Sequence, residues 1–494
     1  MPAAVECAES ESGVPAAVES AGSESGVPAA VECAESESGA PVAVESAESE
    51  SAARAGGMGE PATSVPREKQ YPRLRRRLYT LAQDNRILYL EPQHPDWITI
   101  NVRYKGIFDL LDGRHPRTAI DAYICQHHSD EAKVLTTQVS ELIAHSVLFT
   151  DDHPPPRLEG DTTHPTLRYV YLTITDSCNL NCTYCYAKER MPVPSLPFEQ
   201  WIRLVDHLIS FATPLVFTFT GGEPLLFDGT LELARYVRRK GSQCILLTNG
   251  TLIRDGDFAK QLADAFNLIK ISLDSHLTDV NARLRGTGCL PRVQRALELL
   301  GQAGATAMVL ATVTRLNKDH LREFSSNFGN NVQFQPLYRM GSANDSPALA
   351  LSGDEYFDAL SAAGVIQSLS EYHGSIHAFR GNPRKRCAMA AQELSIGPNG
   401  DVFPCHMLHY QDLKLGNLAE VRGMEAVYAS PLACRLRRLS VDVLPQCREC
   451  PVRNFCAGAC RARISYPSPG LEGSDPFCNF ERRLILDALL YSYG

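Results

Sequence analysis

The sequence predicts an α/β fold: a partial (β/α)6 TIM-type barrel with an N-terminal winged-helix-like α+β domain and a C-terminal cysteine-rich domain. Between residues 165 and 345, short apolar runs alternate with helical patterns, as in a parallel sheet covered by helices. Residues 71–150 hold three strand patterns followed by three helical patterns. Residues 380–494 are rich in Cys, Gly and Pro, so we expect bound metal to hold that domain in shape.

Acidic repeats begin the chain. A 13-residue motif occurs four times between residues 2 and 53 and offers too little apolar surface to fold, so residues 1–66 are expected to be disordered. Cys7 and Cys33 stand where the other repeats carry serine, which argues against a metal-binding role. Residues 1–53 hold eleven glutamates and no Lys or Arg. The rest of the chain therefore has 46 of the 57 acidic side chains and all 48 basic ones, a balance that argues against nucleic acid as a partner.

The sixteen cysteines are the most unusual feature of the composition. No apolar run is long enough to cross a bilayer, and the N-terminus lacks the basic and then apolar pattern of a secretory signal. We therefore expect a cytoplasmic protein without a membrane partner. In the cytoplasm, clustered cysteines favour metal or redox chemistry over disulfides.

The N-terminal domain is predicted over residues 71–150. The strand patterns lie at 77–80, 87–90 and 97–100, with a turn at Asp84-Asn85. The helical patterns begin at Ile107 and end in a helix over 134–148. Three strands followed by three helices suggest a winged-helix arrangement, and a Pro-rich linker follows at 151–156.

The barrel is predicted from six apolar runs, separated by helical patterns such as 198–211 and 292–300. The runs are residues 169–174, 215–219, 244–247, 268–272, 308–313 and 332–334. Six such units imply a parallel sheet that closes fully or partly into a barrel. In these folds the chemistry lies at the carboxyl ends of the strands.

A cysteine loop follows the first predicted barrel strand. Cys178, Cys182 and Cys185 have the spacing Cys-x3-Cys-x2-Cys. Three thiolates on a short loop can ligate three irons of a 4Fe-4S cluster, which leaves the fourth iron open for catalysis. A zinc site is the alternative, but it needs a fourth ligand, and no suitable histidine follows.

This loop resembles the signature of the radical S-adenosylmethionine (SAM) family, including the aromatic Tyr184 before the third cysteine. The resemblance implies that the open iron binds the amino and carboxylate groups of SAM. It also implies reductive cleavage of SAM and a 5′-deoxyadenosyl radical that abstracts a hydrogen atom from the substrate. An external donor such as a flavodoxin or ferredoxin is expected to supply the electron.

A glycine-rich stretch follows the second predicted strand and resembles the SAM-binding turn of that family. Gly221 and Gly222 allow a close backbone approach, although an ordinary glycine turn is the alternative. The resemblance implies that Gly221, Gly222, Glu223 and Pro224 contact SAM, with Glu223 near its ammonium group.

Two further stretches resemble SAM contacts. Ser272 and Asp274 end the fourth predicted strand and resemble the family's Ser-Leu-Asp, which contacts the ribose or carboxylate of SAM; both residue types are also common helix caps. Arg285 belongs to an Arg-Gly pair seen in many relatives. We expect it to meet the SAM carboxylate, with a surface ion pair as the alternative.

A second cysteine group lies near the C-terminus. Its members are Cys387, Cys405, Cys447, Cys450, Cys456, Cys460 and Cys478. Their order and spacing, with Gly400, resemble the SPASM extension of radical SAM enzymes; a zinc ribbon is the alternative for the central four. The resemblance implies two auxiliary iron–sulfur clusters, expected to be 4Fe-4S, for three clusters in all. The outer one would have Cys447, Cys450, Cys456 and Cys478, and the inner one only Cys387, Cys405 and Cys460. The inner cluster would then either keep an open site or be completed by another residue, with Cys434, which lies between the groups, as a candidate.

His406 follows the second of these cysteines. Relatives that oxidise a sulfatase residue typically have an aspartate there, used as a base, so His406 counts against sulfatase maturation. A hydrogen-bonded supporting role is one interpretation, and a proton-accepting catalytic role is the other.

The N-terminal domain resembles the RiPP recognition element, which binds the leader peptides of ribosomally made precursors, in the stretch from Ile107 to Gly113 and in the closing helix to Leu148. A generic winged helix that binds DNA is the alternative. We expect a leader to add a strand along residues 97–102 and to pack on the last helix. The sequence thus predicts a radical SAM/SPASM peptide maturase that cross-links its peptide by a thioether or carbon–carbon bond. The alternatives are a radical SAM enzyme acting on a folded protein or a small molecule, and a non-catalytic zinc protein that binds peptides.

Overall fold

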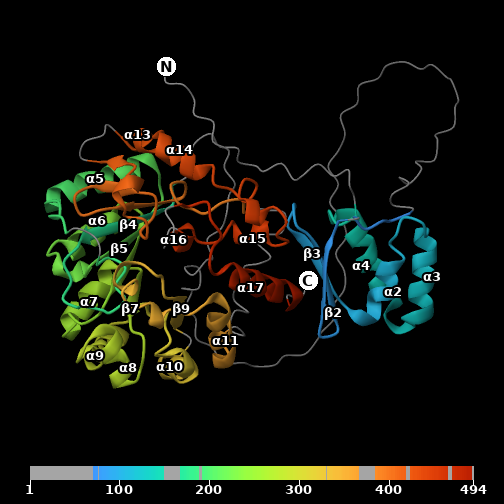
Figure 1. The fold of residues 1–494 in the computed structure, drawn as a ribbon, viewed down its shortest axis with the longest axis horizontal. Coiled ribbons are helices and arrows are strands. Elements are labelled where there is room, and N and C mark those ends of the chain that lie inside the picture. The colour runs from blue at the N-terminus through green and yellow to red at the C-terminus, as the bar shows by residue number, and fades with distance from the viewer. Residues whose placement is uncertain are drawn as a thin grey trace, which may run out of the picture. The chain divides into compact units, whose positions relative to one another are not determined.

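The computed structural model describes residues 71–75, 77–149, 167–188, 192–329, 331–365, 384–418, 423–464 and 470–491 (Figure 1). The acidic repeats expected over residues 1–66 and the linker expected at 151–156 lie outside these ranges. The described residues form two compact units. One contains residues 75–106 and 146–491, and the other contains residues 71–74 and 107–145.

A nine-stranded sheet forms the centre of the larger unit. Its strands are β4 (Tyr169–Thr175), β5 (Val216–Gly221), β6 (Gln243–Thr248), β7 (Leu268–Ser272), β8 (Ala307–Val313), β9 (Val332–Pro336), β10 (Glu393–Ile396), β11 (Asp401–Phe403) and β12 (Gly416–Asn417). The order across the sheet is β12-β11-β10-β4-β5-β6-β7-β8-β9. Strands β4 to β9 are all parallel, and within the described residues the end strands β12 and β9 do not pair with each other, so the predicted partial barrel is confirmed.

The sheet extends past the predicted barrel. Strand β10 pairs in parallel with β4, while β11 and β12 add antiparallel strands beyond it. These three strands are four, three and two residues long, too short for a sequence pattern to reveal. The consequence is that the C-terminal cysteine region is joined to the barrel by backbone hydrogen bonds.

Helices follow the barrel strands as predicted. They are α5 (Phe198–Phe211), α6 (Thr230–Arg239), α7 (Gly256–Ala265), α8 (Thr278–Arg285), α9 (Cys289–Gln302), α10 (Leu321–Phe328) and α11 (Gly353–Ala363). Helix α5 has the bounds that its sequence pattern predicts. It buries Trp201, Leu204, Val205 and Leu208, which recur at helical spacing on one face and pack into the main core beside the strands.

The C-terminal region consists of short helices and one long one. They are α13 (Met424–Tyr428), α14 (Pro431–Arg437), α15 (Arg453–Cys456), α16 (Arg461–Ile464) and α17 (Cys478–Tyr491). A three-stranded antiparallel sheet packs on this region: β1 (Tyr79–Gln83), β2 (Arg86–Glu91) and β3 (Asp96–Asn101). Trp97, Phe455 and Leu489 belong to the core that joins the sheet to α15 and α17.

The smaller unit is helical. Helix α2 (Lys105–Asp109) begins at its boundary, and α3 (Arg117–His127) packs against α4 (Ala132–His145). Arg117 donates to the Asp121 carboxylate at 2.9 Å and to the Thr136 carbonyl at 2.8 Å, which ties the two helices together. The three strands and three helices predicted for residues 71–150 are thus all present, but they divide between the two compact units.

No helix in the described ranges is long and apolar enough to span a bilayer.

Candidate active site and metal centres

The first cysteine loop leaves the carboxyl end of β4. Val170, Leu172 and Ile174 are fully buried in the core, so the chain emerges from the sheet just before Cys178. The Cys178 side chain is exposed, whereas Cys182 and Cys185 are half-buried. The loop therefore presents its thiols at the strand ends, where the chemistry of such folds lies.

The paired glycines after β5 pack directly on this loop. The Gly222 N–H donates to the Thr175 carbonyl at 2.8 Å, and the Glu223 N–H donates to the Ser177 carbonyl at 2.8 Å. A Cβ on Gly221 would lie 2.2 Å from the Thr175 oxygen, and one on Gly222 would lie 2.3 Å from the Ser177 oxygen. Both glycines are thus required by the cysteine loop itself, whatever contacts they make with SAM.

We expect Gly222→Ala to reduce cluster assembly, because its methyl group would push Ser177 and the adjacent Cys178 away. The neighbouring atoms are backbone and cannot simply rotate aside. Iron and sulfide content after anaerobic reconstitution measures the effect, with a loss corresponding to one cluster. Gly256→Ala is the matched control, since nothing lies within 4 Å of a Cβ there. Equal iron content in both variants would show that the close packing at Gly222 is dispensable.

Glu223 lies fully buried beneath the loop. Its carboxylate accepts hydrogen bonds from the Thr248 hydroxyl at 2.7 Å, the Asn249 N–H at 2.8 Å and the Leu225 N–H at 3.1 Å. Burial raises the pKa of Glu223, and these hydrogen bonds oppose the rise. Pro224, also buried, begins a short 3-10 turn. The structure thus places Glu223 as the link between the ends of β5 and β6, and its contact with the SAM ammonium stays a prediction.

The turn after β6 holds the cysteine loop from the other side. The Asn249 amide donates to the Asn179 side chain at 2.8 Å, and the Asn179 amide donates to the Thr251 hydroxyl at 2.8 Å. Asn179 lies between the first two cysteines. These side-chain bonds fix the start of the loop on β6.

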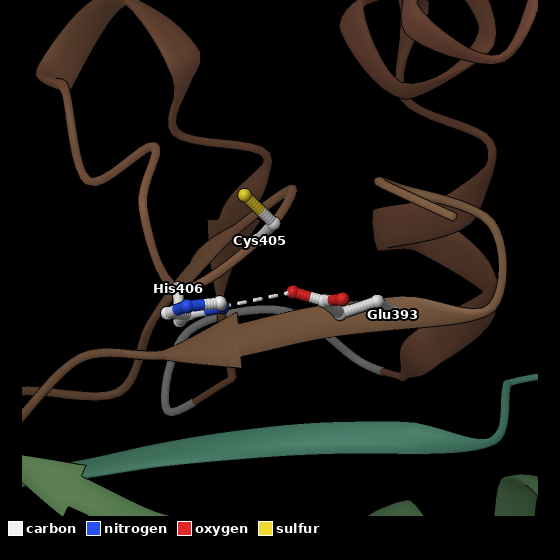
Figure 2. A group of neighbouring side chains, drawn as sticks. All are labelled: Glu393, Cys405 and His406. Atoms are coloured by element: carbon white, nitrogen blue, oxygen red, sulfur yellow. Dashed lines mark hydrogen bonds and ion pairs between the residues drawn. The ribbon is translucent and has the colours of Figure 1, made fainter. Parts of the chain in front are cut away.

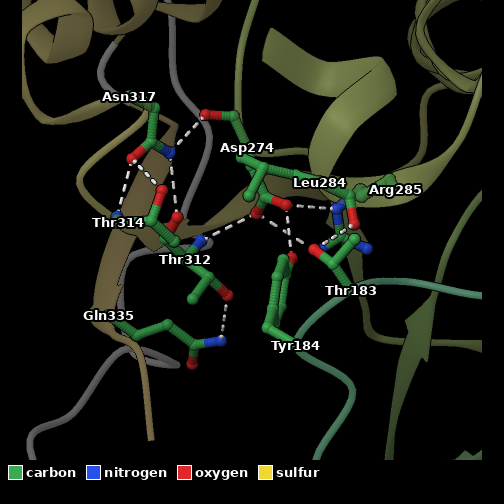
Figure 3. A network of polar contacts seen from close by, with 9 residues as sticks. All are labelled: Thr183, Tyr184, Asp274, Leu284, Arg285, Thr312, Thr314, Asn317 and Gln335. Atoms are coloured by element: carbon green, nitrogen blue, oxygen red, sulfur yellow. Dashed lines mark hydrogen bonds and ion pairs between the residues drawn. The ribbon is translucent and has the colours of Figure 1, made fainter. Parts of the chain in front are cut away.

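Asp274, Arg285 and Tyr184 form a buried network at the end of β7 (Figure 3). The Asp274 carboxylate accepts bonds from Arg285 Nε at 2.7 Å, Arg285 Nη2 at 3.2 Å and the Thr312 N–H at 2.9 Å, as well as from the Tyr184 hydroxyl. Asp274 is 1% exposed and Arg285 is 8% exposed, so the ion pair is inside the protein and not on its surface.

This network connects the end of the cysteine loop, next to Cys185, to the sheet. Tyr184 precedes Cys185, and the Thr183 N–H donates to the Leu284 carbonyl, next to Arg285, at 3.0 Å. Asn317 donates to the Asp274 carbonyl at 2.7 Å and to the Thr312 carbonyl at 2.9 Å. Ser272 is the last residue of β7. The SAM contacts predicted for Tyr184, Ser272, Asp274 and Arg285 stay predictions.

The three thiols of the loop suit a bound cluster. Burial raises the pKa of Cys182 to about 11; Arg285 opposes this rise, while Cys185 and Cys178 add to it. Burial also raises the pKa of Cys178. The thiols therefore lie close enough to repel one another as thiolates, and cluster iron would relieve that repulsion because bound metal favours deprotonated ligands.

The inner cysteines of the C-terminal region also gather. Burial raises the pKa of Cys405 well above its usual value, and Glu393, Cys387 and Cys460 raise it further. Burial raises the pKa of Cys387 to about 11, with Cys460 adding to it. Cys387, Cys405 and Cys460 thus lie near one another, as the resemblance implied, although no described fourth cysteine joins them.

The outer cysteines form a separate group. Burial raises the pKa of Cys456, and Cys450 and Cys478 contribute to the rise. The pKa of Cys447 is likewise raised by burial, and Cys450 and Cys478 again contribute. The four thiols suit a closed site with one thiolate for each iron. The assignment of all ten cysteines as ligands stays a prediction.

Residues after β9 lie between the two cysteine regions. The Tyr338 hydroxyl lies 3.6 Å from Cys460 Sγ, and the Ser342 N–H donates to the Cys185 carbonyl at 3.0 Å. A Cβ on Gly341 would lie 2.3 Å from that carbonyl oxygen. Our sequence interpretation missed this segment, although its position at a strand end was a usable signal. A cavity of about 310 Å³ adjoins it, lined in part by Tyr338 and Arg463.

Two ion pairs of Arg463 support the inner cysteine group, and the sequence interpretation did not predict them. Arg463 donates to the Asp475 carboxylate at 2.7 Å and to Glu481 at 2.6 Å, and the Cys460 N–H donates to Asp475 at 3.0 Å. No sequence spacing indicated this contact, because Asp475 is twelve residues from Arg463 and fifteen from Cys460, and the three residues meet only in the folded chain.

His406 pairs with Glu393 beside Cys405 (Figure 2). His406 Nδ1 lies 3.2 Å from Glu393 Oε1, and its ring stacks on Tyr171 at a centroid distance of 4.1 Å. Glu393 is the first residue of β10. No sequence motif indicated this glutamate, and the proton-accepting role of His406 stays a prediction.

Comparison with known families agrees with this geometry. Residues 172–326 match the radical SAM superfamily, and residues 387–451 match SPASM, an iron–sulfur cluster-binding domain. The chain is therefore an iron–sulfur enzyme of the radical SAM class. More narrowly, it is a radical SAM enzyme with a SPASM domain, which confirms the class predicted from the cysteine motifs and disfavours a non-catalytic zinc protein.

Individual relatives have different activities. The AdoMet-dependent heme synthase of Oleidesulfovibrio alaskensis is 27% identical over 65% of this chain and 89% of its own length. Mycofactocin maturase MftC of Mycolicibacterium smegmatis is 29% identical over 67% of this chain and 88% of its own. SuiB of Streptococcus suis, solved bound to the precursor peptide SuiA, matches with a TM-score of 0.50 and 13% identity over 82% of this chain and 98% of SuiB. That last likeness concerns the fold alone.

Proposed function

We propose that this enzyme modifies a ribosomally made precursor peptide. The observation that carries the proposal is the three-stranded sheet β1–β3, which lies before the radical SAM region and has an edge strand, β3, suited to pairing with a peptide. MftC supports a maturase activity, and SuiB was solved with a precursor peptide. Residues 167–494 make up about two thirds of the chain, so the likeness to SuiB over 82% must include residues before 167.

The proposed cofactors are SAM and three iron–sulfur clusters. The chain would hold one catalytic cluster by Cys178, Cys182 and Cys185, an inner auxiliary cluster by Cys387, Cys405 and Cys460, and an outer one by the remaining four cysteines. When bound, SAM and the catalytic cluster would supply a 5′-deoxyadenosyl radical, and methionine would be released from the cleaved SAM. The radical would take one hydrogen atom from the peptide and leave as 5′-deoxyadenosine. The strand-end contacts of the loop hold its thiols in place for this step.

Cross-linking by a thioether or carbon–carbon bond is the proposed outcome. After the first hydrogen atom has left, closing the new bond releases one proton and one electron, so the product is lighter by two hydrogen atoms. The electron passes to an auxiliary cluster, and an external flavodoxin or ferredoxin supplies the electron that begins the next turnover. We place the reaction in the cytoplasm, where such donors and ribosomal precursors are found.

The β3 edge offers defined hydrogen-bonding groups. The Val102 N–H donates to the Asn85 carbonyl at 2.8 Å, and residues 98 and 100 therefore also point their backbone groups toward β2. Thr99 and Asn101 point theirs the other way, where no described strand pairs with β3. A leader lying along this edge would accept from the Thr99 N–H.

We expect Thr99→Pro to weaken precursor binding by about fivefold to tenfold, the value of one backbone hydrogen bond of roughly 1 kcal/mol. Proline removes the outward N–H but leaves the pairs with β2 intact, and edge strands tolerate it. Thr99→Val is the matched control, because it keeps that N–H while losing the hydroxyl bond to the Leu489 carbonyl. Fluorescence anisotropy with a labelled precursor peptide measures both. Equal weakening in the two variants would contradict pairing along β3.

Anaerobic co-expression tests the function itself. The enzyme is produced with the short peptide encoded beside its gene, and the peptide is examined by mass spectrometry. We expect a product lighter by two hydrogen atoms for each cross-link. An unchanged peptide, together with no 5′-deoxyadenosine, would count against the proposal.

A small-molecule substrate is the second candidate, and the likeness to an AdoMet-dependent heme synthase favours it. That match covers 65% of the chain and the MftC match covers 67%, so coverage does not separate the two candidates, and the sheet β1–β3 is what favours the peptide. If iron porphyrins stimulate 5′-deoxyadenosine formation and precursor peptides do not, this candidate replaces the first.

A further inference from the structure

We propose that Glu393 is the fourth protein ligand of the inner auxiliary cluster, so that no iron of this cluster is open to substrate. The inference deepens the proposed function, since it assigns the inner cluster to electron transfer and not to substrate binding. It rests on the presence of iron–sulfur clusters but not on the identity of the substrate.

The geometry brings a carboxylate to the cysteines. One ligand atom each of Glu393, Cys405 and His406 lies within 4.8 Å of the others. Glu393 begins β10, where its register opposite Tyr169 of β4 fixes the backbone. Cys405 follows β11, which pairs with β10. Two neighbouring strands thus deliver the carboxylate and the thiol to one place, as Figure 2 shows.

The negative charges of Glu393 and the inner cysteines favour a bound metal centre. Glu393 lies close enough to Cys405 and Cys387 that its charge raises the pKa of both thiols. Three thiolates and a carboxylate in one half-buried space repel one another. Arg461 and Arg463 of α16 are nearby cations, but Arg461 donates to the Leu471 and Gly473 carbonyls and Arg463 is paired with Asp475 and Glu481. Cluster iron compensates the negative charge that remains.

Glu393 suits ligation better than His406. His406 Nδ1 contacts Glu393 Oε1, its ring is held flat against Tyr171, and its side chain is 29% exposed against 19% for the more buried Glu393. That contact leaves Glu393 Oε2 for iron. Carboxylates that bind a metal are themselves held by hydrogen bonds, and His406 would hold Glu393 in this way. Rieske centres show that one iron of a cluster accepts ligands other than cysteine.

The test uses cyanide as a probe of open iron. A chain with Cys178, Cys182 and Cys185 all changed to alanine is reconstituted anaerobically, reduced and mixed with isotopically labelled cyanide. Electron–nuclear double resonance then detects cyanide carbon bound to a cluster. The unaltered chain without SAM is the positive control, because its catalytic cluster has an open iron that binds cyanide.

We expect no cyanide coupling in the triple-alanine chain and a clear coupling once Glu393→Ala is added. His406→Asn in the same chain should leave the inner cluster closed. Should Glu393→Ala lose the inner cluster altogether, Glu393→Cys is expected to restore its iron content with a lower reduction potential.

Three results would overturn the proposal. The first is cyanide coupling in the triple-alanine chain while Glu393 is intact, which would mean an open inner cluster. The second is a Glu393→Ala chain that keeps its iron and still binds no cyanide. The third is loss of the inner cluster in both Glu393 variants. Peptide modification does not enter this readout, so failure here leaves the proposed substrate untouched, and failure of the substrate leaves this result intact.

Discussion

Cys182→Ala is expected to abolish the conversion of SAM to 5′-deoxyadenosine, reducing it to the level of a protein-free control. Two thiolates cannot hold a cluster that needs three, and Cys182 lies between Cys178 and Cys185 on the loop fixed by β5, β6 and β7. The rate is measured by liquid chromatography with dithionite as reductant. Iron content should fall by the iron of one cluster.

Cys125→Ala is the control for this loss. Its thiol is exposed on α3 and belongs to neither cysteine group, so the variant should retain full activity and full iron content. Persistent 5′-deoxyadenosine formation by Cys182→Ala would mean that the loop does not hold the catalytic cluster. Equal losses in both variants would point to general thiol damage.

Asp274→Ala is expected to lower the free energy of unfolding by about 3–5 kcal/mol, because it leaves a buried guanidinium unpaired. Arg285 would lose both bonds to the carboxylate, and Tyr184 and the Thr312 N–H would lose their acceptor. Since Tyr184 precedes Cys185, the cysteine loop should loosen as well. Thermal unfolding under anaerobic conditions and iron content measure the two effects.

Glu355→Ala serves as the matched control. Glu355 pairs with Arg315 by two hydrogen bonds and accepts the Ser352 N–H in the capping box of α11, but these side chains reach water, so the loss of stability should be far smaller than that of Asp274→Ala. Asp274→Asn should fall between the two alanine variants, since it keeps an acceptor but removes the charge. A similar stability for Asp274→Ala and Glu355→Ala would refute a structural role for the buried network.

The barrel could be predicted because its signals are local. Six apolar runs and their helices each carry their own periodicity, and α5 has its predicted bounds. The strands β10 to β12 could not be predicted, because they are short and are stabilised by pairing with a strand more than two hundred residues earlier. The division of residues 71–150 between two units also depends on tertiary packing, in which Trp97 contacts Phe455.

The residues of the candidate site could be predicted where they belong to a short sequence motif. The cysteines, Glu223, Asp274 and Arg285 were found from short patterns, but the patterns say nothing of their partners. The structure pairs Asp274 with Arg285 and places Glu223 under Thr248 and Asn249. Glu393 and Asp475 belong to no motif. Only the fold brings Glu393 beside Cys405 and Asp475 beside Cys460.

Deuterium transfer tests the central claim most directly. The enzyme is incubated anaerobically with SAM, a reductant and a precursor peptide whose carbon-bound hydrogens are replaced by deuterium. Because the proposed radical takes a hydrogen atom from the peptide, the 5′-deoxyadenosine should contain one deuterium and the peptide should become cross-linked. Unlabelled 5′-deoxyadenosine with an unchanged peptide would contradict a radical SAM enzyme that acts on peptides.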